Sequence, residues 1–340
     1  MTTTGKTFLA SVTLLIAVTQ QSGATSITVD NNGIHAAQYT TLQAAVSAAV
    51  SGDTIYMHGS LTDYGTVQIF KQLTIIGSGY RIDGTLNNLN TYINAISLYA
   101  GSSGTRLMGL SISLINHAGT GDYIDNIYIS RCYLGTLQIW GDNWVIENNI
   151  AYIQFDKAGA VGCIIQNNIL SGMNFQNTNS TGIIINHNII QGQVQDISFA
   201  TFTNNIFFFA EESAAPSVTS CIFNNNLTVS SSSDVLPFGT NTGTGNFNTI
   251  SAANLFAGGM SAIVGYPAIT TSDWHILAAS PAHNAGTDGT DLGIYGGTKP
   301  MINLTGATNL IPQMTLLNIS NPSLPVNDNL NVRFKARKQD

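Results

Sequence analysis

Val-Ile-Glu-Asn-Asn-Ile, at residues 145–150, is the first clear copy of a phrase that returns four times and decides the fold. The later copies are Ile-Ile-Gln-Asn-Asn-Ile (164–169), Ile-Ile-Asn-His-Asn-Ile (184–189), Thr-Phe-Thr-Asn-Asn-Ile (201–206) and Ile-Phe-Asn-Asn-Asn-Leu (222–227). The last Asn of each copy is Asn149, Asn168, Asn188, Asn205 or Asn226, so the copies follow one another at nearly equal steps. Self-similarity at such a period indicates a solenoid, in which each repeat buries its apolar face by stacking on its neighbours.

Each phrase is short, rich in β-branched residues and followed by Gly, Ser or Thr, without a helical period. This pattern suits one turn (a rung) of a parallel β-helix, in which successive rungs lie about 4.8 Å apart. Asn side chains at one register can then pass hydrogen bonds from rung to rung as a ladder. In weaker form, the register places Cys132 at the ladder position one repeat before Asn149, and Ser111 one repeat before Cys132.

Composition argues against an ordinary globular domain and against nucleic-acid binding. Only 9% of the 340 residues are charged, compared with about a quarter in typical domains. Residues 7–332 hold 6 Lys and Arg against 17 Asp and Glu, a formal charge of −11. A surface of this sign is expected to repel nucleic acid.

The N-terminal segment, residues 1–24, has the pattern of a secretory signal peptide. Lys6 precedes an apolar run from Phe8 to Val18, and Ser22-Gly23-Ala24 resembles a cleavage site. The rival interpretation is a membrane anchor, but this run is too short to span a bilayer and no later segment is long enough either. We therefore expect a secreted or cell-surface protein without a membrane span.

One helix is expected, over residues 41–50. Thr40 and Gln43 have capping-box spacing, and Gly52 ends the helix. An open β-helix end exposes unpaired backbone, so an amphipathic helix that covers it is the expected remedy. Asp53 is interpreted as a turn former.

Two stretches resemble a known superfamily. Tyr-Thr-Thr-Leu-Gln-Ala-Ala-Val-Ser-Ala-Ala-Val-Ser-Gly-Asp-Thr-Ile-Tyr (39–56) resembles the N-terminal cap of the pectin-lyase-like right-handed parallel β-helix proteins, and Ser280–Gly296 is similar to their closing segment. With the Asn phrases, the resemblance covers about residues 36–300. It implies an all-β, right-handed parallel β-helix with an N-terminal capping helix. It leaves several functions open, because the superfamily includes lyases, hydrolases, epimerases and adhesins.

The domain prediction is a signal peptide at 1–24, the β-helix at 25–300 and a small C-terminal β appendage at 301–340. Residues 228–279 hold no clean rung and are expected to be irregular. Within the appendage, apolar residues alternate with polar ones as in a half-buried strand: Leu330, Val332, Phe334 and Ala336. The appendage is expected to cover the C-terminal end of the solenoid, with a sorting or attachment tail as the rival.

The three cysteines are expected to be free and buried. Cys163 and Cys221 occupy the same register three rungs apart, about 14 Å by rung spacing. A disulfide needs Cα atoms within about 7 Å. Cys132 lies at another register.

Known catalytic patterns are missing. The chain lacks the calcium-binding acids and Arg-rich strand of pectate lyases, the polygalacturonase motifs, a phosphate-binding Gly-Lys loop and zinc-type Cys/His spacing. His187 is interpreted as a ladder substitute. Asp288 and Asp291 flank glycines and are interpreted as turn residues.

One pair of segments could carry a site. Tyr123-Ile124-Asp125-Asn126 precedes Cys132 with the spacing by which Trp140-Gly141-Asp142-Asn143 precedes Asn149. In adjacent rungs Tyr123 should stack on Trp140, and Asp125 should lie about 5 Å from Asp142. Stacked aromatics suit sugar rings, and two close carboxylates suit a retaining glycosidase or a Ca²⁺ site. The alternative is an Asx turn duplicated with the rung.

These observations favour a structural or carbohydrate-binding β-helix, with Tyr123, Trp140 and Trp144 as the substrate-binding residues. The alternative is a polysaccharide hydrolase or lyase that uses Asp125 and Asp142 as its catalytic residues. No metal ligand and no cofactor are assigned, with Ca²⁺ at the paired carboxylates as the alternative. A neutral or weakly charged polysaccharide is the expected partner, because a body near −11 repels polyuronates.

Overall fold

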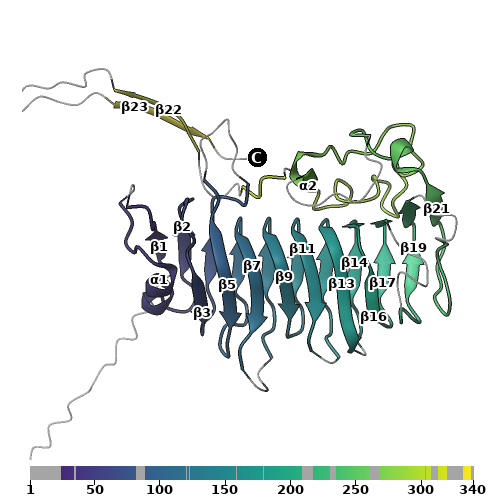
Figure 1. Cartoon of the computed structure of the whole chain (residues 1–340), viewed down its shortest axis with the longest axis horizontal. Helices are drawn as coiled ribbons and strands as arrows, with labels where there is room; N and C mark the ends of the chain where they lie inside the picture. Colours follow the sequence, from purple (N-terminus) through teal and green to yellow (C-terminus); the bar gives the residue numbers. More distant parts are fainter. Residues whose placement is uncertain are drawn as a thin grey trace, which may run out of the picture.

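The computed structural model describes residues 24–33, 36–81, 89–119, 121, 123–157, 159–178, 180–208, 217–229, 235–259, 268–302, 304–307, 313–319 and 332–337. Within these residues the chain is nearly all β and forms a parallel β-solenoid, with its rungs stacked along the long axis (Figure 1). The predicted signal peptide lies outside the described residues, except for Ala24. None of the described helices is long and apolar enough to cross a membrane.

Two parallel sheets form the solenoid. Sheet A contains ten short strands in the order β1 (Ser26–Val29), β2 (Thr54–Met57), β4 (Thr74–Ile76), β6 (Arg106–Met108), β8 (Tyr128–Ser130), β10 (Val145–Glu147), β12 (Ile164–Gln166), β14 (Ile184–Asn186), β17 (Thr201–Thr203) and β19 (Ile222–Asn224). Sheet B contains β3 (Thr66–Ile69), β5 (Tyr92–Leu98), β7 (Ser111–His117), β9 (Tyr133–Ile139), β11 (Ile150–Phe155), β13 (Ile169–Thr178), β15 (Ile189–Ile190), β18 (Ile206–Phe207), β20 (Leu227–Val229) and β21 (Phe247–Ile250), with β16 (Val194–Ile197) also paired to β13.

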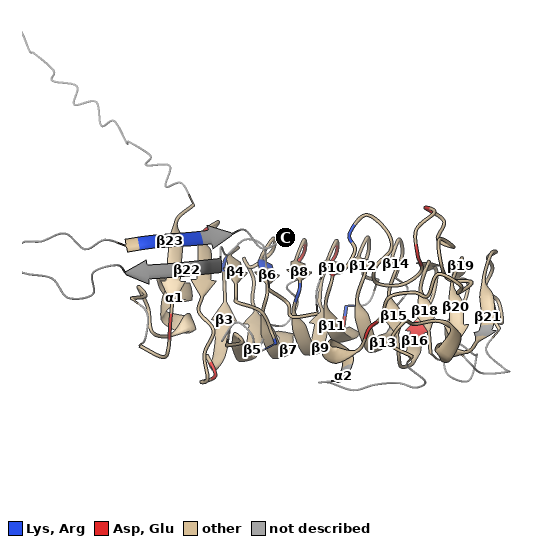
Figure 2. Cartoon of the chain, turned by 90° about the horizontal axis from the view of Figure 1, so that it is seen from above, with Lys and Arg blue, Asp and Glu red and all other residues tan. Residues whose placement is uncertain are grey.

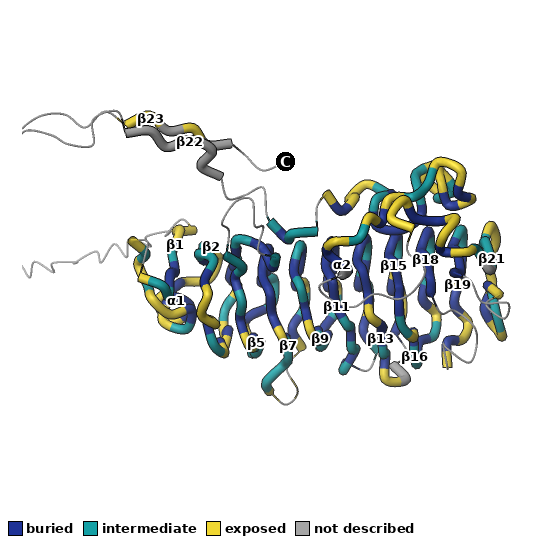
Figure 3. The backbone as a smooth tube through the Cα atoms, turned by 45° about the horizontal axis from the view of Figure 1, so that its top comes forward, coloured by how far each residue is buried: buried dark blue, intermediate teal, exposed yellow. Residues whose placement is uncertain are grey.

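The repeated phrase supplies the strands of sheet A and the bend into sheet B. Its central apolar residue is buried in every rung and pairs with its equivalent, as Ile146 pairs with Ile129 and Ile165. Larger side chains stack in the same way, since the rings of Phe202 and Phe223 lie parallel with centroids 4.6 Å apart. Figure 3 shows the buried positions recurring along the whole solenoid.

The expected Asn ladder is confirmed. The backbone N–H of each ladder residue donates to the side-chain oxygen of the next ladder Asn at 2.8–3.0 Å, along Cys132, Asn149, Asn168, Asn188, Asn205, Asn226 and Asn246. The ladder therefore reaches one rung further than the sequence indicated. Asn246 and β21 continue the solenoid within residues 228–279, which we had expected to hold no clean rung.

The residue before each ladder position takes the left-handed conformation and turns its side chain away from the core. We call the following set the outer stripe: Arg131, Asn148, Asn167, His187, Asn204 and Asn225, with φ between 52° and 60°. Asn tolerates this conformation better than most residues. His187 belongs to the outer stripe, so its interpretation as a ladder substitute was wrong by one position.

The register of the earlier rungs also differs from the prediction. Met108 pairs with Ser130 and Ser111 pairs with Tyr133, which places Leu110 opposite Cys132. Ser111 is therefore not at the ladder position. The sequence does not reveal this one-residue difference in register, because Leu110, the residue at the ladder position of this rung, is apolar and has no amide side chain.

The single N-terminal helix, α1, spans Leu42–Ala48 and packs against β1, β2 and β3 (Figure 1). Thr41, rather than Thr40, is the N-cap, and its side-chain oxygen accepts a hydrogen bond from the Ala44 N–H. Asp53 accepts hydrogen bonds from the N–H groups of Thr25 and Val50, which confirms it as a turn residue.

After β21 the chain folds back along the solenoid. It passes through the short helices η1 (Ala252–Asn254) and α2 (Ala268–Thr271). Residues 280–302 and 304–307, the return segment, then run against the outer stripe towards the N-terminal rungs, so that Ala285 contacts Asn225 and Ala307 contacts Arg131.

Strands β22 (Gln313–Ile319) and β23 (Val332–Arg337) form an antiparallel hairpin, as the alternating pattern indicated for β23. Figure 1 places this hairpin on the side of β1 to β5, away from β21. It therefore does not cover the C-terminal end of the solenoid, contrary to the prediction. Figure 2 shows Lys and Arg along β23.

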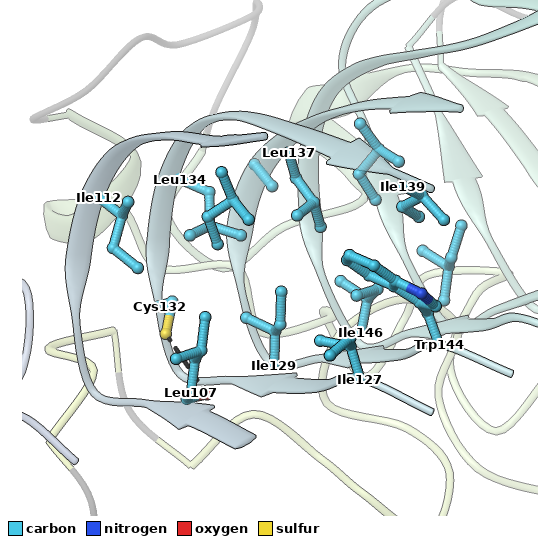
Figure 4. Close-up of a cluster of buried hydrophobic side chains, with 14 of the residues drawn as sticks. Leu107, Ile112, Ile127, Ile129, Cys132, Leu134, Leu137, Ile139, Trp144 and Ile146 are labelled. Carbon is cyan, nitrogen blue, oxygen red and sulfur yellow. Dashed lines mark hydrogen bonds between the residues drawn. The ribbon is translucent and has the colours of Figure 1, made fainter. Parts of the chain in front are cut away.

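The cysteines should be unreactive in the native protein. All three are free and buried, and burial raises the pKa of Cys132 to about 12 and that of Cys163 to about 11. Figure 4 shows Cys132 among the core side chains.

At about pH 8, where an ordinary thiol is partly ionised, Ellman's reagent should detect no thiol before unfolding and three afterwards. Fast reaction of a native thiol would contradict this packing.

Candidate functional site

The paired carboxylates form part of a second, shorter ladder at the turn between sheets B and A. Asp125 Oδ1 accepts the Asp142 N–H at 2.8 Å, and Asp142 Oδ1 accepts the Val161 N–H at 2.8 Å. Gly141 makes this approach feasible, since a Cβ there would overlap the Ile124 carbonyl oxygen. The two carboxylates are adjacent as predicted, but both are engaged in holding the turn.

The three aromatic candidates have different environments. Trp144 is fully buried and its indole N–H donates to the Ile124 carbonyl oxygen at 2.6 Å, so it is a core residue and has no surface for a ligand (Figure 4). Tyr123 is 54% exposed, and the Lys157 ammonium lies 4.4 Å from its ring centroid. That ammonium also pairs with Asp142 at 2.5 Å.

The ring that stacks on Trp140 is His117 rather than Tyr123. The two ring planes differ by 4° and their centroids are 5.0 Å apart. Trp140 follows β9, and His117 is the last residue of the neighbouring strand β7. Tyr123 remains close to this pair, because the N–H of Ile124 donates to the Trp140 carbonyl oxygen at 2.9 Å.

These rings continue a line of aromatics that the sequence did not suggest. Phe70 follows β3 and Tyr99 follows β5, and their rings stack at 4.2 Å. Because β3, β5, β7 and β9 are consecutive in sheet B, we call Phe70, Tyr99, His117 and Trp140 the aromatic row. Phe70 is 51% exposed and the other three rings are half-buried.

Polar side chains accompany the aromatic row. Gln68 donates from Nε2 to the Tyr99 hydroxyl at 3.2 Å, and Gln138 lies on β9 two positions before Trp140. Asn116 Oδ1, His117 Nε2 and Trp140 Nε1 are buried without a hydrogen-bond partner. Unpaired buried polar atoms are rare in folded proteins, and three of them lie together at this edge of sheet B.

The outer stripe binds the return segment through side chains. Asn167 Nδ2 donates to the carbonyl oxygens of Ile294 and Gly296, and Asn204 Nδ2 donates to the Thr287 hydroxyl. His187 Nε2 lies 3.0 Å from Asp288 Oδ2. Burial raises the pKa of Asp288, but hydrogen bonds from Thr290 and His187 outweigh it and leave the pKa below its usual value.

A cavity of about 330 Å³ lies between sheet A and the return segment. Its residues are Arg106, Met108, Tyr128, Ser130, Arg131, Glu147, Asn148, Thr298, Lys299, Pro300 and Ile302. The Tyr128 hydroxyl donates to Glu147 Oε1 at 2.5 Å, and burial together with this carboxylate raises the pKa of Tyr128 to about 12. The sequence pointed to none of these residues, which come from three strands and a distant segment.

Groups of side chains that could hold a metal ion were sought among the described residues. No group of three or more His, Cys, Asp or Glu is placed there to hold an ion. Asp125 and Asp142 do not fit a Ca²⁺ site, which needs six to eight oxygen ligands, because Lys157 already occupies one carboxylate and backbone N–H groups engage both.

No protein-family model matches this chain, and no curated protein matches its sequence. The assignment of a function therefore depends on the geometry of the aromatic row, the paired carboxylates and the cavity.

Proposed function

We propose that this protein binds a neutral or weakly charged polysaccharide along the aromatic row. We further propose that it is a secreted or cell-surface member of the pectin-lyase-like superfamily, with a right-handed coil and α1 as its N-terminal cap. The observation that carries the binding proposal is the pair of ring stacks, Phe70 with Tyr99 and His117 with Trp140, at the ends of four consecutive strands of sheet B.

The aromatic row has the chemistry of a sugar-binding surface. Aromatic side chains provide apolar area at low entropic cost. Within each stacked pair the facing surfaces cover each other, so the outer faces and the exposed edges of the rings remain for contact with the C–H groups of pyranose rings. The neighbouring amides of Gln68 and Gln138 can exchange hydrogen bonds with sugar hydroxyls. Rings at successive rungs, about 4.8 Å apart, would engage successive sugar units, so the row favours an extended chain over a single sugar.

Binding is favoured over hydrolysis or lyase chemistry. A retaining glycosidase needs two carboxylates that face the scissile bond. Asp125 and Asp142 each accept a backbone N–H of the following rung. These bonds give Oδ1 of each carboxylate a structural role in the turn, and the Lys157 ammonium also pairs with Asp142 Oδ1, so catalysis at these oxygens would compete with the contacts that hold the turn.

A polysaccharide panel should test the proposal. We expect wild type to bind at least one neutral polysaccharide in affinity electrophoresis, and Trp140→Ala and Phe70→Ala to bind it about tenfold more weakly, the usual scale for losing a central aromatic. The matched control is Phe199→Ala, because Phe199 is an exposed aromatic (58%) between β16 and β17, outside the row.

The outcome of the panel separates the functions. Loss of binding in both row variants, with Phe199→Ala unchanged, supports the aromatic row. Equal binding by wild type and Phe70→Ala would place the site elsewhere. No binding to any polysaccharide would favour a purely structural role.

A further inference from the structure

The cavity lies beside Asn148, a member of the outer stripe whose side chain makes no hydrogen bond to the described residues of the return segment. Asn167, Asn204 and Asn225 each donate a side-chain hydrogen bond to that segment. Asn148 occupies the same register with the same left-handed backbone, but its Oδ1 is buried without a partner. Asn148 is only 8% exposed and lines the cavity. The fold therefore leaves an unsatisfied amide acceptor beside this space. Because Asn148 Oδ1 is closed to solvent, a hydrogen-bond donor in the cavity reaches it when the Asn148 side chain turns towards the cavity.

The charge around the cavity differs from that of the rest of the protein. Arg106, Arg131 and Lys299 line it, with Glu147 as the single carboxylate, in a body that is acidic overall. Both oxygens of Glu147 already accept hydrogen bonds, from the Tyr128 hydroxyl and from Gln166 Nε2. The cationic side chains therefore outnumber the carboxylate, and an anion is the favoured occupant.

The arginines still have donors for a ligand. The guanidinium of Arg106 lies 4.0 Å from the ring centroid of Tyr128, and Arg131 Nη1 donates to the Ala307 carbonyl oxygen at 3.2 Å. A guanidinium carries five N–H donors, so these contacts hold the two groups in place and leave most donors available. Carboxylate and phosphate groups both match such a fork, and we take the carboxylate as the smaller of the two for a cavity of about 330 Å³.

The residues that line the cavity are buried at one end and exposed at the other. Its floor consists of Met108, Ser130, Glu147 and Asn148, which are buried, whereas Arg106, Lys299 and Pro300 at its rim are exposed. A volume of about 330 Å³ lies near the lower end of the range for small-molecule pockets, about 300–1,000 Å³. A small ligand could therefore place an acid group at the rim and a polar group at the floor.

We propose that this cavity binds a small hydroxylated carboxylate, whose acid group pairs with Arg106 and Arg131 and whose hydroxyl donates to Asn148 Oδ1 once that side chain has turned towards the cavity. A carboxylate without a hydroxyl leaves Asn148 unsatisfied, and a polyol without an acid leaves the cationic rim unpaired. The proposal does not depend on polysaccharide binding at the aromatic row.

Three four-carbon probes separate these requirements in isothermal titration calorimetry with the full chain. Tartrate has both hydroxyls and carboxylates, succinate lacks the hydroxyls, and threitol lacks the carboxylates. We expect tartrate to bind, with succinate and threitol each about tenfold weaker or more. Added NaCl should weaken the binding of tartrate, because the contacts are ionic.

Variants locate the binding in the cavity. Arg106→Gln, at an exposed position, should weaken tartrate about tenfold. Asn148→Asp, which keeps the side-chain shape and tolerates positive φ, should weaken it at least as much by adding a negative charge. Arg333→Gln on β23 is the matched control and should bind as wild type does, because Arg333 does not line the cavity.

Three results would overturn the proposal. These are no heat of binding with about 10 mM tartrate, succinate binding as tightly as tartrate, or an Arg106→Gln variant that matches Arg333→Gln. Trp140→Ala should leave tartrate binding unchanged, and Arg106→Gln should leave polysaccharide binding unchanged. Failure at one site is thereby distinguished from failure at the other.

Discussion

Replacing Asn168 with Leu should lower the free energy of unfolding by about 3–5 kcal/mol, since each orphaned buried polar group costs about 1–3 kcal/mol. Asn168 Oδ1 accepts the Asn149 N–H at 2.8 Å, and its Nδ2 donates to the Ile146 and Gln166 carbonyl oxygens at 2.9 Å. Nδ2 also donates to Asn188 Oδ1 at 3.0 Å. Leu has a similar volume but replaces none of these bonds.

Urea denaturation followed by circular dichroism measures this loss. The matched control is Asn94→Leu, because Asn94 is exposed on β5 and only its backbone N–H takes part in the described hydrogen bonds. That variant should change the free energy of unfolding by about 0.5 kcal/mol or less. If both variants unfolded at the same urea concentration, the ladder would not be the main polar support of the bend.

Replacing Gly296 with Ala should displace the return segment and cost about 2–4 kcal/mol, at or above the usual range for overpacking. A Cβ on Gly296 would overlap the Asp291 carbonyl oxygen and lie 2.5 Å from His187 Cε1. The first of these atoms is backbone and cannot rotate away. Moving the segment would also break the hydrogen bond from Asn167 to Gly296 and unpack Ile294 from the core.

Limited proteolysis with chymotrypsin checks this prediction, because a displaced segment should be cut after Tyr295 much faster than in wild type. The same variant should lose tartrate binding, since the return segment forms one wall of the cavity.

Gly289→Ala is the matched control: nothing lies within 4 Å of its Cβ, although its φ of 77° is unfavourable. It should cost about 1 kcal/mol without faster cleavage. Similar cleavage of the two variants would show that close packing at Gly296 is unimportant.

The chain by itself determined the architecture, because the relevant signals lie within a few neighbouring residues. The short β-branched run that opens each phrase selects a strand. An Asn that recurs near the end of each phrase selects the bend, and stacking then follows from the equal length of the phrases. The same reasoning located the Asp125–Asp142 adjacency, since both residues stand seven positions before a ladder residue.

Two ladder positions were misassigned from the sequence. In each case the residue type or its surroundings differ from those of the other rungs, although the backbone bends in the same way. Leu110 holds the ladder position of its rung without an amide, so Ser111 was assigned in its place. Asn246 continues the ladder inside a Gly- and Thr-rich stretch that looks irregular. In both cases the left-handed residue before the ladder, Gly109 or Gly245, was the local signal that could have corrected the register.

Only the tertiary structure revealed the aromatic row and the cavity. Phe70, Tyr99, His117 and Trp140 are unevenly spaced in the sequence, because the loops between rungs differ in length while the strands keep their register. The cavity joins Arg106, Glu147 and Lys299, which meet because the return segment folds back along the outer stripe. Local periodicity specifies how each rung is built, whereas loop lengths and the path of the returning chain decide which side chains of different rungs share a surface.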